Sequence, residues 1–295
     1  MNKYKPESLE LTDEVRKNAD GDFINLNVGN THYKIEGEDN KGNWCVLTHG
    51  YATPLYIYDK IAAGLVENGY KVLRYDLLGR GLSERVKGDY SPQLFASQLH
   101  ELTEKLIPNE SFFLFGTSMG GTITTTFTSN HPDKVKKLIL YAPAGMHYKA
   151  PLYMKLAKIK GIGEVLFKLI AMKVLIKGCA REMIYSGEEA KNNYSEQFAY
   201  CAQFKGMTKA TLSSLRNTIL NFDEANKGYV GTNKAGIKVL TVWGTADKTM
   251  PYYQSEEMKK ILENMTLITF ENSGHIFLYD EGDRTLDVTL PFLKE

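Results

Sequence analysis

Short runs of consecutive apolar residues recur along this chain and predict buried strands. The runs are WCVLT at 44–48, KVLRY at 71–75, SFFLF at 111–115, KLILY at 137–141, KVLTVW at 238–243 and TLITF at 266–270. Continuous apolar runs, as opposed to alternating ones, are typical of parallel strands that are covered on both faces. Two earlier runs, 23–27 and 31–36, flank Gly29 and predict a hairpin with a glycine at a positive φ.

Between these runs, apolar residues at spacings of three and four predict helices. The clearest helix starts with Ser91 as N-cap and Pro92 at its first position, and it stops before Pro108. Similar segments cover about 56–68, the stretch from Gly116 to Pro132, about 253–263 and the C-terminal residues. Strands that alternate with helices favour an α/β fold, with a mostly parallel, doubly wound sheet of about eight strands flanked by helices.

One long stretch interrupts the alternation. From about 145 to 231 no strand-type run occurs, and residues 152–177 have the pattern of amphipathic helices broken at Gly161 and Gly163. We therefore predict a core formed by residues 1–145 and 232–295, of which 1–21 are a polar leader, and an all-helical cap formed by residues 146–231.

Composition narrows the class of protein. The 295 residues carry 36 Lys and Arg against 35 Asp and Glu, a net charge of +1, which disfavours nucleic acid as a partner. Three widely spaced cysteines, Cys45, Cys179 and Cys201, predict free thiols in a reducing compartment. The polar start and the lack of an apolar run near 20 residues lead us to expect a cytoplasmic protein.

Residues 116–120 read Gly-Thr-Ser-Met-Gly, the G-x-S-x-G pattern of a nucleophile elbow. The pattern follows a predicted strand and precedes a predicted helix, as such an elbow requires. Gly116 and Gly120 let strand and helix pass closely while Ser118 sits in a strained, exposed turn. We expect Ser118 to be a nucleophile.

A serine nucleophile needs a base and an acid that orients the base. His275 follows the last predicted strand and Asp247 follows the one before it, so both belong at the sheet edge that carries the elbow. The order Ser, Asp, His along the chain is that of hydrolases with this elbow. Weaker candidates for these roles are the other histidines, His32, His49, His100, His131 and His147, and the acids Asp76, Asp223 and Asp280.

The oxyanion of a tetrahedral intermediate needs two backbone N–H donors. We expect one from Met119, next to the serine, and one from Tyr51, in the turn after the strand at 44–48. Tyr51, Met146 and Ile276 are also expected to contact substrate. No H-E-x-x-H, P-loop or G-x-G-x-x-G motif occurs, so no metal or organic cofactor is predicted.

Six segments together resemble the α/β-hydrolase superfamily. They are HGYATP at 49–54, YDLLGRGLSE at 75–84, GTSMGG at 116–121, LILYAPAG at 138–145, VWGTADKTMP at 242–251 and NSGHIF at 272–277. The resemblance implies that Asp76, Gly79, Gly81 and Ser83 shape a loop structurally. Within the superfamily, the chain most resembles lysophospholipase-like and monoacylglycerol-lipase-like esterases.

That resemblance implies hydrolysis of a small or lipid carboxylic ester through an acyl-enzyme. Two alternatives stay open: a C–C bond hydrolase of the same fold, and a receptor-like member with slow turnover. Dehalogenases and epoxide hydrolases are disfavoured, because they have an aspartate where this chain has Ser118.

The cap sequence bears on the partner. Residues 146–178 contain seven lysines and one acid, Glu164. One interpretation is an amphipathic helix whose apolar side faces the active site while its lysines lie in water. The other is a surface that contacts anionic lipid. The oligomeric state is not predicted.

Overall fold

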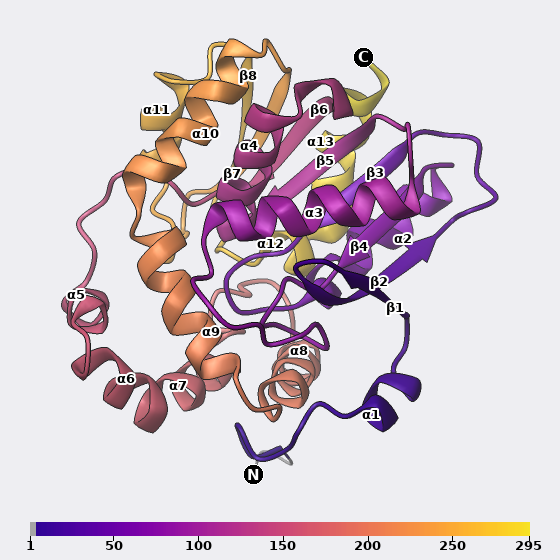
Figure 1. The fold of residues 1–295 in the computed structure, drawn as a ribbon. Helices are drawn as coiled ribbons and strands as arrows, with labels where there is room; N and C mark the ends of the chain where they lie inside the picture. The colour runs from indigo at the N-terminus through magenta and orange to yellow at the C-terminus, as the bar shows by residue number, and fades with distance from the viewer. Residues whose placement is uncertain (1–3) are drawn as a thin grey trace.

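A central sheet organises residues 4–295, which the computed structural model describes, apart from the side chain of Tyr153. Its strands are β1 (Asp22–Leu26), β2 (Gly29–Glu36), β3 (Trp44–Thr48), β4 (Lys71–Tyr75), β5 (Phe112–Thr117), β6 (Val135–Tyr141), β7 (Val239–Gly244) and β8 (Met265–Phe270). Within the described residues, these eight strands have the order β1-β2-β4-β3-β5-β6-β7-β8. β2 pairs antiparallel with β1 and β4, and all other pairs are parallel (Figure 1). The predicted mostly parallel sheet is confirmed.

Burial along the strands follows the apolar runs inside the sheet but not at its edges. Every residue of β3, β5 and β7 is buried, whereas the edge strand β1 buries only Leu26. β8, predicted from the run TLITF, buries only Phe270 because it is the other edge strand, so a continuous apolar run marks full burial only for strands inside the sheet. Gly29, in the hairpin between β1 and β2, has a φ of +138°, as expected.

Helices cover both faces of the sheet (Figure 1). They are α2 (Asp59–Glu67), α3 (Pro92–Leu106), α4 (Met119–Asn130), α11 (Tyr253–Lys259), α12 (Phe277–Asp280) and α13 (Gly282–Lys294), with 3-10 turns at Leu55–Tyr58 and Pro132–Lys134. α2 packs with α13, and α3 packs with α4. The Ser91 hydroxyl accepts the amide of Leu94 at 3.2 Å, which confirms the predicted N-cap of α3.

The segment between β6 and β7 is helical. It contains α5 (Leu152–Lys158), α6 (Ile162–Leu166), α7 (Met172–Gly178), α8 (Glu188–Ala202), α9 (Met207–Ser214) and α10 (Phe222–Lys234), with π-helical turns at Phe167–Ala171 and Leu215–Ile219. α5 to α9 lie together at one end of the molecule (Figure 1). We keep the name cap for residues 146–231; the boundaries of this unit stay a prediction. α10 packs against α4, and the Thr232 hydroxyl donates to the carbonyl of Thr125 at 3.2 Å.

One predicted helix break is wrong. Gly161 does separate α5 from α6, with a φ of +86°, but Gly163 lies inside α6. A Cβ on Gly163 would stand 2.2 Å from the carbonyl oxygen of Ala157, so the glycine is needed for close packing of α6 on the end of α5. Sequence alone does not distinguish a glycine that ends a helix from one that admits a neighbour.

The leader packs on the cap. Its first three residues lie outside the described part of the chain, and a short helix, α1 (Asp13–Lys17), follows. The Glu7 carboxylate accepts the amides of Gly206 (3.0 Å) and Thr208 (2.7 Å) at the start of α9. Leu9 forms a parallel bridge with Phe204. The leader thereby satisfies amides at a helix start that would otherwise lack an acceptor.

Candidate active site

Ser118 occupies a sharp turn between β5 and α4. Its φ of +52° and ψ of −122° lie in a region that residues with a side chain rarely adopt. Its amide donates to the carbonyl of Tyr141 (3.0 Å), and its carbonyl accepts the amides of Gly121 (2.9 Å) and Ala144 (2.8 Å). These bonds hold the strained backbone in place, as the predicted elbow requires.

The two glycines of the motif make the turn sterically feasible. A Cβ on Gly116 would lie 2.6 Å from the carbonyl oxygen of Gly120. A Cβ on Gly120 would lie 2.4 Å from the carbonyl oxygen of Thr48, at the end of β3. Any larger residue would push α4 away from the sheet at the point where Ser118 is exposed to the pocket.

His275 and Asp247 form a buried pair beyond the ends of β8 and β7. His275 Nδ1 lies 2.7 Å from Asp247 Oδ2, and the two residues are 7% and 5% exposed. Asp247 Oδ1 accepts the amides of Thr249 (2.8 Å) and Met250 (2.7 Å). An acceptor at Nδ1 favours the tautomer that carries its proton there, which leaves Nε2 able to accept a proton.

Electrostatics favour the protonated form of this histidine. Burial alone would lower the pKa of His275, but the charge of Asp247 and its hydrogen bond raise it more, and the carboxylate of Glu182 adds to the rise. The net effect is a raised pKa. Such an environment stabilises an imidazolium, which a general base becomes during catalysis.

A pocket of about 340 Å³ joins Ser118 to His275, since both residues line it. Its other walls come from the loop after β3 and from the cap, with Gly50, Tyr51, Ile57, Val174, Leu175 and Ile276 among the lining residues. The structure thus brings together most of the predicted site. Met146, which was expected to contact substrate, is not among the described residues that line this pocket. It is 3% exposed and lines a separate cavity with Tyr253 and Ile261.

The two predicted oxyanion donors belong to segments that adjoin the serine. Met119 is the first residue of α4, where a backbone amide has no acceptor within its own helix. The loop of Gly50 and Tyr51 passes so close that a Cβ on Gly50 would be 3.1 Å from the Ser118 Cβ. The Tyr51 hydroxyl donates to the carbonyl of Thr211 at 2.9 Å, which ties this loop to α9. This arrangement is compatible with the predicted roles, which stay predictions.

Comparison with known proteins identifies the family. A profile of the serine aminopeptidase, S33, family matches residues 39–282. The chain belongs to this family. The S33 family match covers strands β3 to β8, the elbow, the cap and the His275 turn, and it confirms the predicted α/β-hydrolase of serine-hydrolase type.

Relatives of this S33 protein include enzymes named for lipid substrates. Lipase 1 of Psychrobacter immobilis is 24% identical over 280 residues, covering 90% of this chain and 81% of the lipase. Monoacylglycerol lipase ABHD6 of Homo sapiens is 24% identical over 281 residues, covering 88% of this chain and 78% of that enzyme. The crystal structure of the enol-lactonase from Burkholderia xenovorans LB400 superposes with a TM-score of 0.78 at 19% identity, covering 93% and 100% of the two chains, and shows the shared fold.

Two residues at the site of the S33 protein were missed by the sequence reasoning. Glu182, from the cap, accepts hydrogen bonds from the backbone amides of Lys248 (2.9 Å) and His275 (3.2 Å). Thr249 lines the pocket, and its hydroxyl donates to Glu182. No local pattern marks Glu182, because its partners are more than 60 residues away along the chain.

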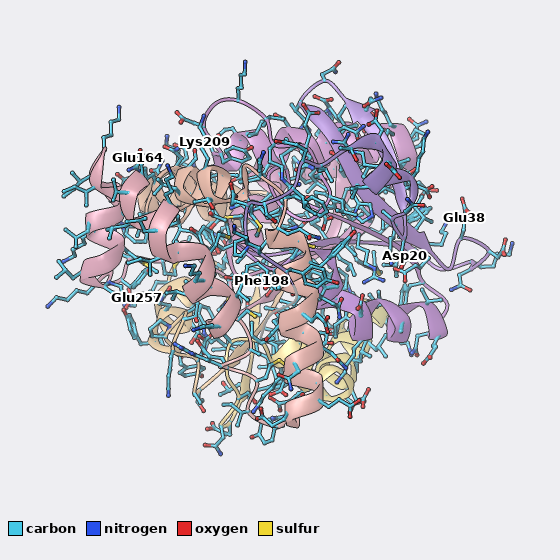
Figure 2. The ribbon with its side chains drawn as sticks, turned by 90° about the horizontal axis from the view of Figure 1, so that it is seen from below. Asp20, Glu38, Glu164, Phe198, Lys209 and Glu257 are labelled. Carbon is cyan, nitrogen blue, oxygen red and sulfur yellow. The ribbon has the colours of Figure 1, made fainter. Side chains whose placement is uncertain are left out.

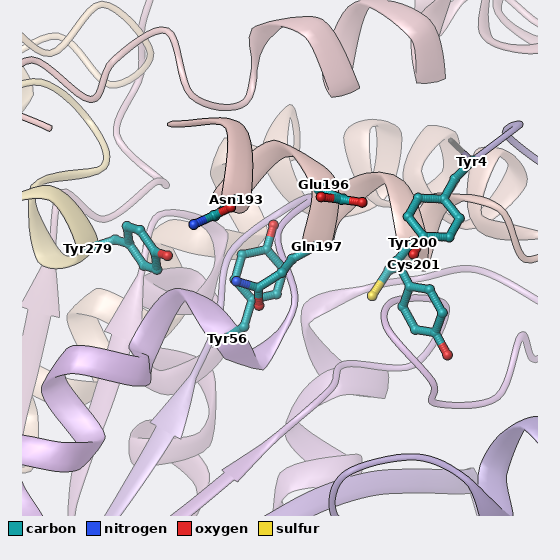
Figure 3. A pocket seen from close by; sticks show the side chains of 8 residues that line it. All are labelled: Tyr4, Tyr56, Asn193, Glu196, Gln197, Tyr200, Cys201 and Tyr279. Atoms are coloured by element: carbon teal, nitrogen blue, oxygen red, sulfur yellow. The ribbon is translucent and has the colours of Figure 1, made fainter. Parts of the chain in front are cut away.

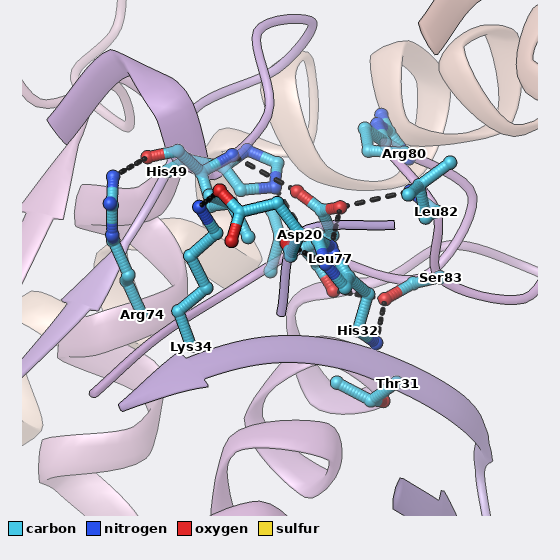
Figure 4. A network of polar contacts seen from close by, with 12 residues as sticks. Asp20, Thr31, His32, Lys34, His49, Arg74, Leu77, Arg80, Leu82 and Ser83 are labelled. Atoms are coloured by element: carbon cyan, nitrogen blue, oxygen red, sulfur yellow. Dashed lines mark hydrogen bonds and ion pairs between the residues drawn. The ribbon is translucent and has the colours of Figure 1, made fainter. Parts of the chain in front are cut away.

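A second buried Asp–His pair supports the loop next to the site (Figure 4). Asp76 Oδ2 lies 2.7 Å from His32 Nδ1 and accepts the amide of Leu82 at 2.9 Å. Burial opposes the charge of Asp76, yet the charge and hydrogen bond of His32, together with the amide of Leu55, lower the pKa of Asp76 to about 2. Burial also lowers the pKa of His32, but the charge and hydrogen bond of Asp76 raise it more. Both groups are engaged structurally, as the family resemblance implied for Asp76.

Four of the weaker candidates for base and acid also have structural contacts. His49 is fully buried; its Nε2 accepts the amide of Leu77 (2.8 Å), and burial lowers its pKa to about 4. His100 and His131 stack with ring centroids 4.1 Å apart. Asp280 accepts three cap amides, at 2.6, 2.9 and 2.7 Å.

A separate groove of about 640 Å³ runs along α8 (Figure 3). Tyrosines, among them Tyr56, Tyr200 and Tyr279, line it together with Glu196. The described residues that line it include neither Ser118 nor His275, the predicted nucleophile and base. Among residues 4–295, no cluster of three or more His, Cys, Asp or Glu side chains is arranged to hold a metal ion.

Proposed function

We propose that this protein hydrolyses carboxylic esters through an acyl-enzyme, with Ser118 as nucleophile, His275 as general base and Asp247 as the acid that orients it. The observation that carries the proposal is the strained Ser118 turn in the same pocket as His275, whose Nδ1 is held by Asp247 at 2.7 Å. The raised pKa of His275 supports a base that is protonated during the reaction.

In the proposed reaction, Ser118 Oγ attacks the ester carbonyl while His275 Nε2 takes the hydroxyl proton. The amides of Tyr51 and Met119 donate hydrogen bonds to the resulting oxyanion. The intermediate collapses, His275 passes its proton to the leaving alkoxide, and an alcohol departs. Water then gives a proton to His275 and attacks the acyl-enzyme, and Ser118 regains its proton as the carboxylic acid leaves.

The pocket walls favour an acyl or other apolar group in the substrate. Ile57, Ile276, Val174 and Leu175 contribute aliphatic side chains to the lining, two from the core and two from the cap. This aliphatic part of the wall suits an acyl chain, which gains free energy on leaving water, while the rest of the lining is more polar and includes Arg181, Glu182 and Thr249. Relatives named as lipases support the same class, so we infer a monoacylglycerol-like or lysophospholipid-like ester.

A fluorophosphonate probe tests the nucleophile, and esters of increasing chain length test the substrate class. We expect Ser118 to be labelled, Ser118→Ala to be unlabelled, and kcat/KM for p-nitrophenyl esters to rise with acyl length until the pocket is filled. Labelling without turnover would favour the receptor-like alternative. Hydrolysis of a vinylogous 1,5-diketone but not of esters would favour the C–C bond hydrolase.

We also propose that the cap meets an anionic lipid surface. One interpretation of the amphipathic pattern was that the apolar side chains of the cap face the active site. Seven aliphatic side chains of the cap are instead 46–71% exposed: Leu152, Ile159, Ile162, Val165, Leu169, Ile170 and Val174. All seven lysines of residues 146–178 are exposed among them, and Glu164 is engaged by Arg216 at 2.6 Å. Figure 2 shows Glu164 on the cap, far from Asp20 and Glu38 on the core.

The positive charge of this cap face favours anionic lipid over a second copy of the chain as its partner. Seven lysines and one acid leave a local charge of +6 on a chain whose total is +1. A second copy would bring the same positive face and be repelled, whereas anionic lipid headgroups attract each lysine by about 1 kcal/mol. Val174 belongs both to the exposed face and to the pocket lining, so a docked surface would adjoin the entrance used by an acyl chain.

Co-sedimentation with anionic vesicles tests this contact. Reversing Lys155, Lys158 and Lys160 to Glu removes about 3 kcal/mol of attraction and adds repulsion by three carboxylates, so binding is expected to weaken by at least about a hundredfold. A matched control reverses three exposed core lysines, Lys41, Lys87 and Lys294. Equal loss in both triple variants, or none in the cap variant, would contradict the proposal. We also propose a cytoplasmic location, which the cysteine pattern led us to expect. Within the described residues, no helix has the length and apolarity to cross a bilayer.

A further inference from the structure

One stretch of the cap without helix returns to the catalytic edge of the sheet. It lies between α7 and α8, and Glu182 is half-buried within it. The Glu182 carboxylate accepts hydrogen bonds from two loops at once. Lys248 and Thr249 belong to the loop that carries Asp247, and His275 belongs to the loop after β8. A single cap side chain therefore joins the acid loop to the base loop.

Two further features seat this stretch in one position. Asp280, five residues beyond His275, accepts the amides of Ile184 (2.6 Å), Tyr185 (2.9 Å) and Ser186 (2.7 Å). Gly274 touches the backbone of Glu182 so closely that a Cβ there would lie 2.2 Å from the Glu182 carbonyl oxygen. Only a glycine before His275 permits this approach.

The hydrogen bonds close a ring around the acid and the base. Thr249 donates its hydroxyl to Glu182 and its amide to Asp247 Oδ1 at 2.8 Å. Asp247 Oδ2 binds His275 Nδ1 at 2.7 Å, and the His275 amide returns to Glu182 at 3.2 Å. Each of these four residues is thereby held by its two neighbours in the ring. The ring adds a cap contact to the direct bonds between the two loops, in which the Ala246 amide donates to the Ser273 carbonyl at 3.0 Å and the Asn272 amide donates to the Thr245 hydroxyl at 2.9 Å.

We propose that Glu182 is a positioning residue of the cap that sets the spacing of the Asp247 and His275 loops and places a second negative charge near the imidazolium. The inference rests on the proposed function, because it assigns the role of base to His275. Glu182 touches the backbone of the base, and its carboxylate acts through His275 and Thr249. Its charge raises the pKa of His275 in the same direction as that of Asp247. The contact of the cap with the two loops and the pKa of His275 therefore depend on the same carboxylate.

Two variants separate charge from spacing. Glu182→Gln keeps size and one acceptor oxygen but removes the charge. Thr249→Val keeps the charge of Glu182 but removes the hydroxyl that links it to the acid loop. Glu189→Gln, on the exposed side of α8, is the matched control for loss of one carboxylate. Thermal unfolding of each variant confirms that it is folded before its kinetics are compared.

The readout is the rate of fluorophosphonate labelling between pH 4 and 10, together with an NMR titration of the His275 ring. For Glu182→Gln we expect the acid limb and the ring titration to move down by about half a pH unit, and the plateau rate to fall by about threefold to tenfold. For Thr249→Val we expect a lower plateau with an unmoved limb. Glu189→Gln should behave as wild type.

Each outcome bears on a different claim. An unmoved limb and ring titration in Glu182→Gln, with a plateau within twofold of wild type, would overturn the role of Glu182. A wild-type plateau in Thr249→Val would overturn the positioning of the acid loop. Absence of labelling in the wild type would instead refute the proposed function, while the ring titration would still report the influence of Glu182 on His275.

Discussion

Gly120 allows a quantitative test of the elbow. A Cβ at this position would lie 2.4 Å from the carbonyl oxygen of Thr48 and 2.7 Å from that of His49. Both obstacles are backbone, so a side-chain rotation cannot relieve them. A carbon beside a carbonyl oxygen needs roughly 3.3 Å, and Gly120→Ala must therefore separate α4 from the end of β3 by about 0.9 Å.

That displacement acts directly on catalysis. The end of β3 leads into the Tyr51 loop, and α4 begins with Met119, so the two expected oxyanion donors would move apart. A misplacement of about 1 Å costs roughly a hundredfold in rate. We expect kcat/KM for a short p-nitrophenyl ester to fall by about that factor, and overpacking to lower the free energy of unfolding by about 1–3 kcal/mol.

The control is Gly187→Ala. Gly187 has an ordinary φ of −69°, and a Cβ there would meet no atom within 4 Å. This variant should keep wild-type kcat/KM. If Gly120→Ala stays folded by circular dichroism and loses less than threefold in kcat/KM, the steric account of the elbow is wrong.

Three further outcomes are expected. Asp247→Asn should lower kcat by roughly ten-thousandfold, because an amide at Nδ1 favours the wrong tautomer of His275. The same substitution should move the acid limb of kcat/KM to lower pH. Steady-state kinetics across pH check both effects. For His49, the pKa falls from 6.5 to about 4 on folding, so its contribution to stability is complete above pH 6.5 and decreases as pH falls towards 4. The difference amounts to about 3 kcal/mol, and urea unfolding at pH 7 and 4.5 should show a smaller pH dependence in His49→Gln than in wild type. Asp280→Asn should lower the melting temperature, since three amide donors of the cap lose a charged acceptor, with a cost of about 1–3 kcal/mol; an unchanged melting temperature would argue against this anchor.

The elements that sequence predicted well are those specified by neighbouring residues. The run WCVLT became the fully buried β3, and the Ser91-Pro92 pair began α3 at the expected residue. The elbow was also visible, because its sequence pattern spans only five residues, although the backbone that excludes a side chain at Gly120 belongs to Thr48 and His49. The Asp247–His275 pair was predicted on general grounds, since the carboxyl ends of neighbouring parallel strands meet at one edge of the sheet.

Other features depended on how distant segments meet. The amphipathic pattern of the cap marked its apolar residues but not the direction they face, and the structure turns Leu169 to solvent and Leu175 to the pocket. Met146 was expected at the substrate and lies at another cavity. Glu182 had no distinguishing neighbours, yet it joins the loops of Asp247 and His275.

The sequence by itself therefore determined the α/β core, the strained serine turn and the order of the residues proposed for catalysis, because each depends on local periodicity, on glycine sterics or on a rule of parallel sheets. Only the tertiary structure decided which cap side chains line the pocket, which meet solvent and which carboxylate binds the catalytic loops. Those outcomes depend on the packing of segments many residues apart, and a hydrophobic pattern carries no information about the partner on the other side of a contact.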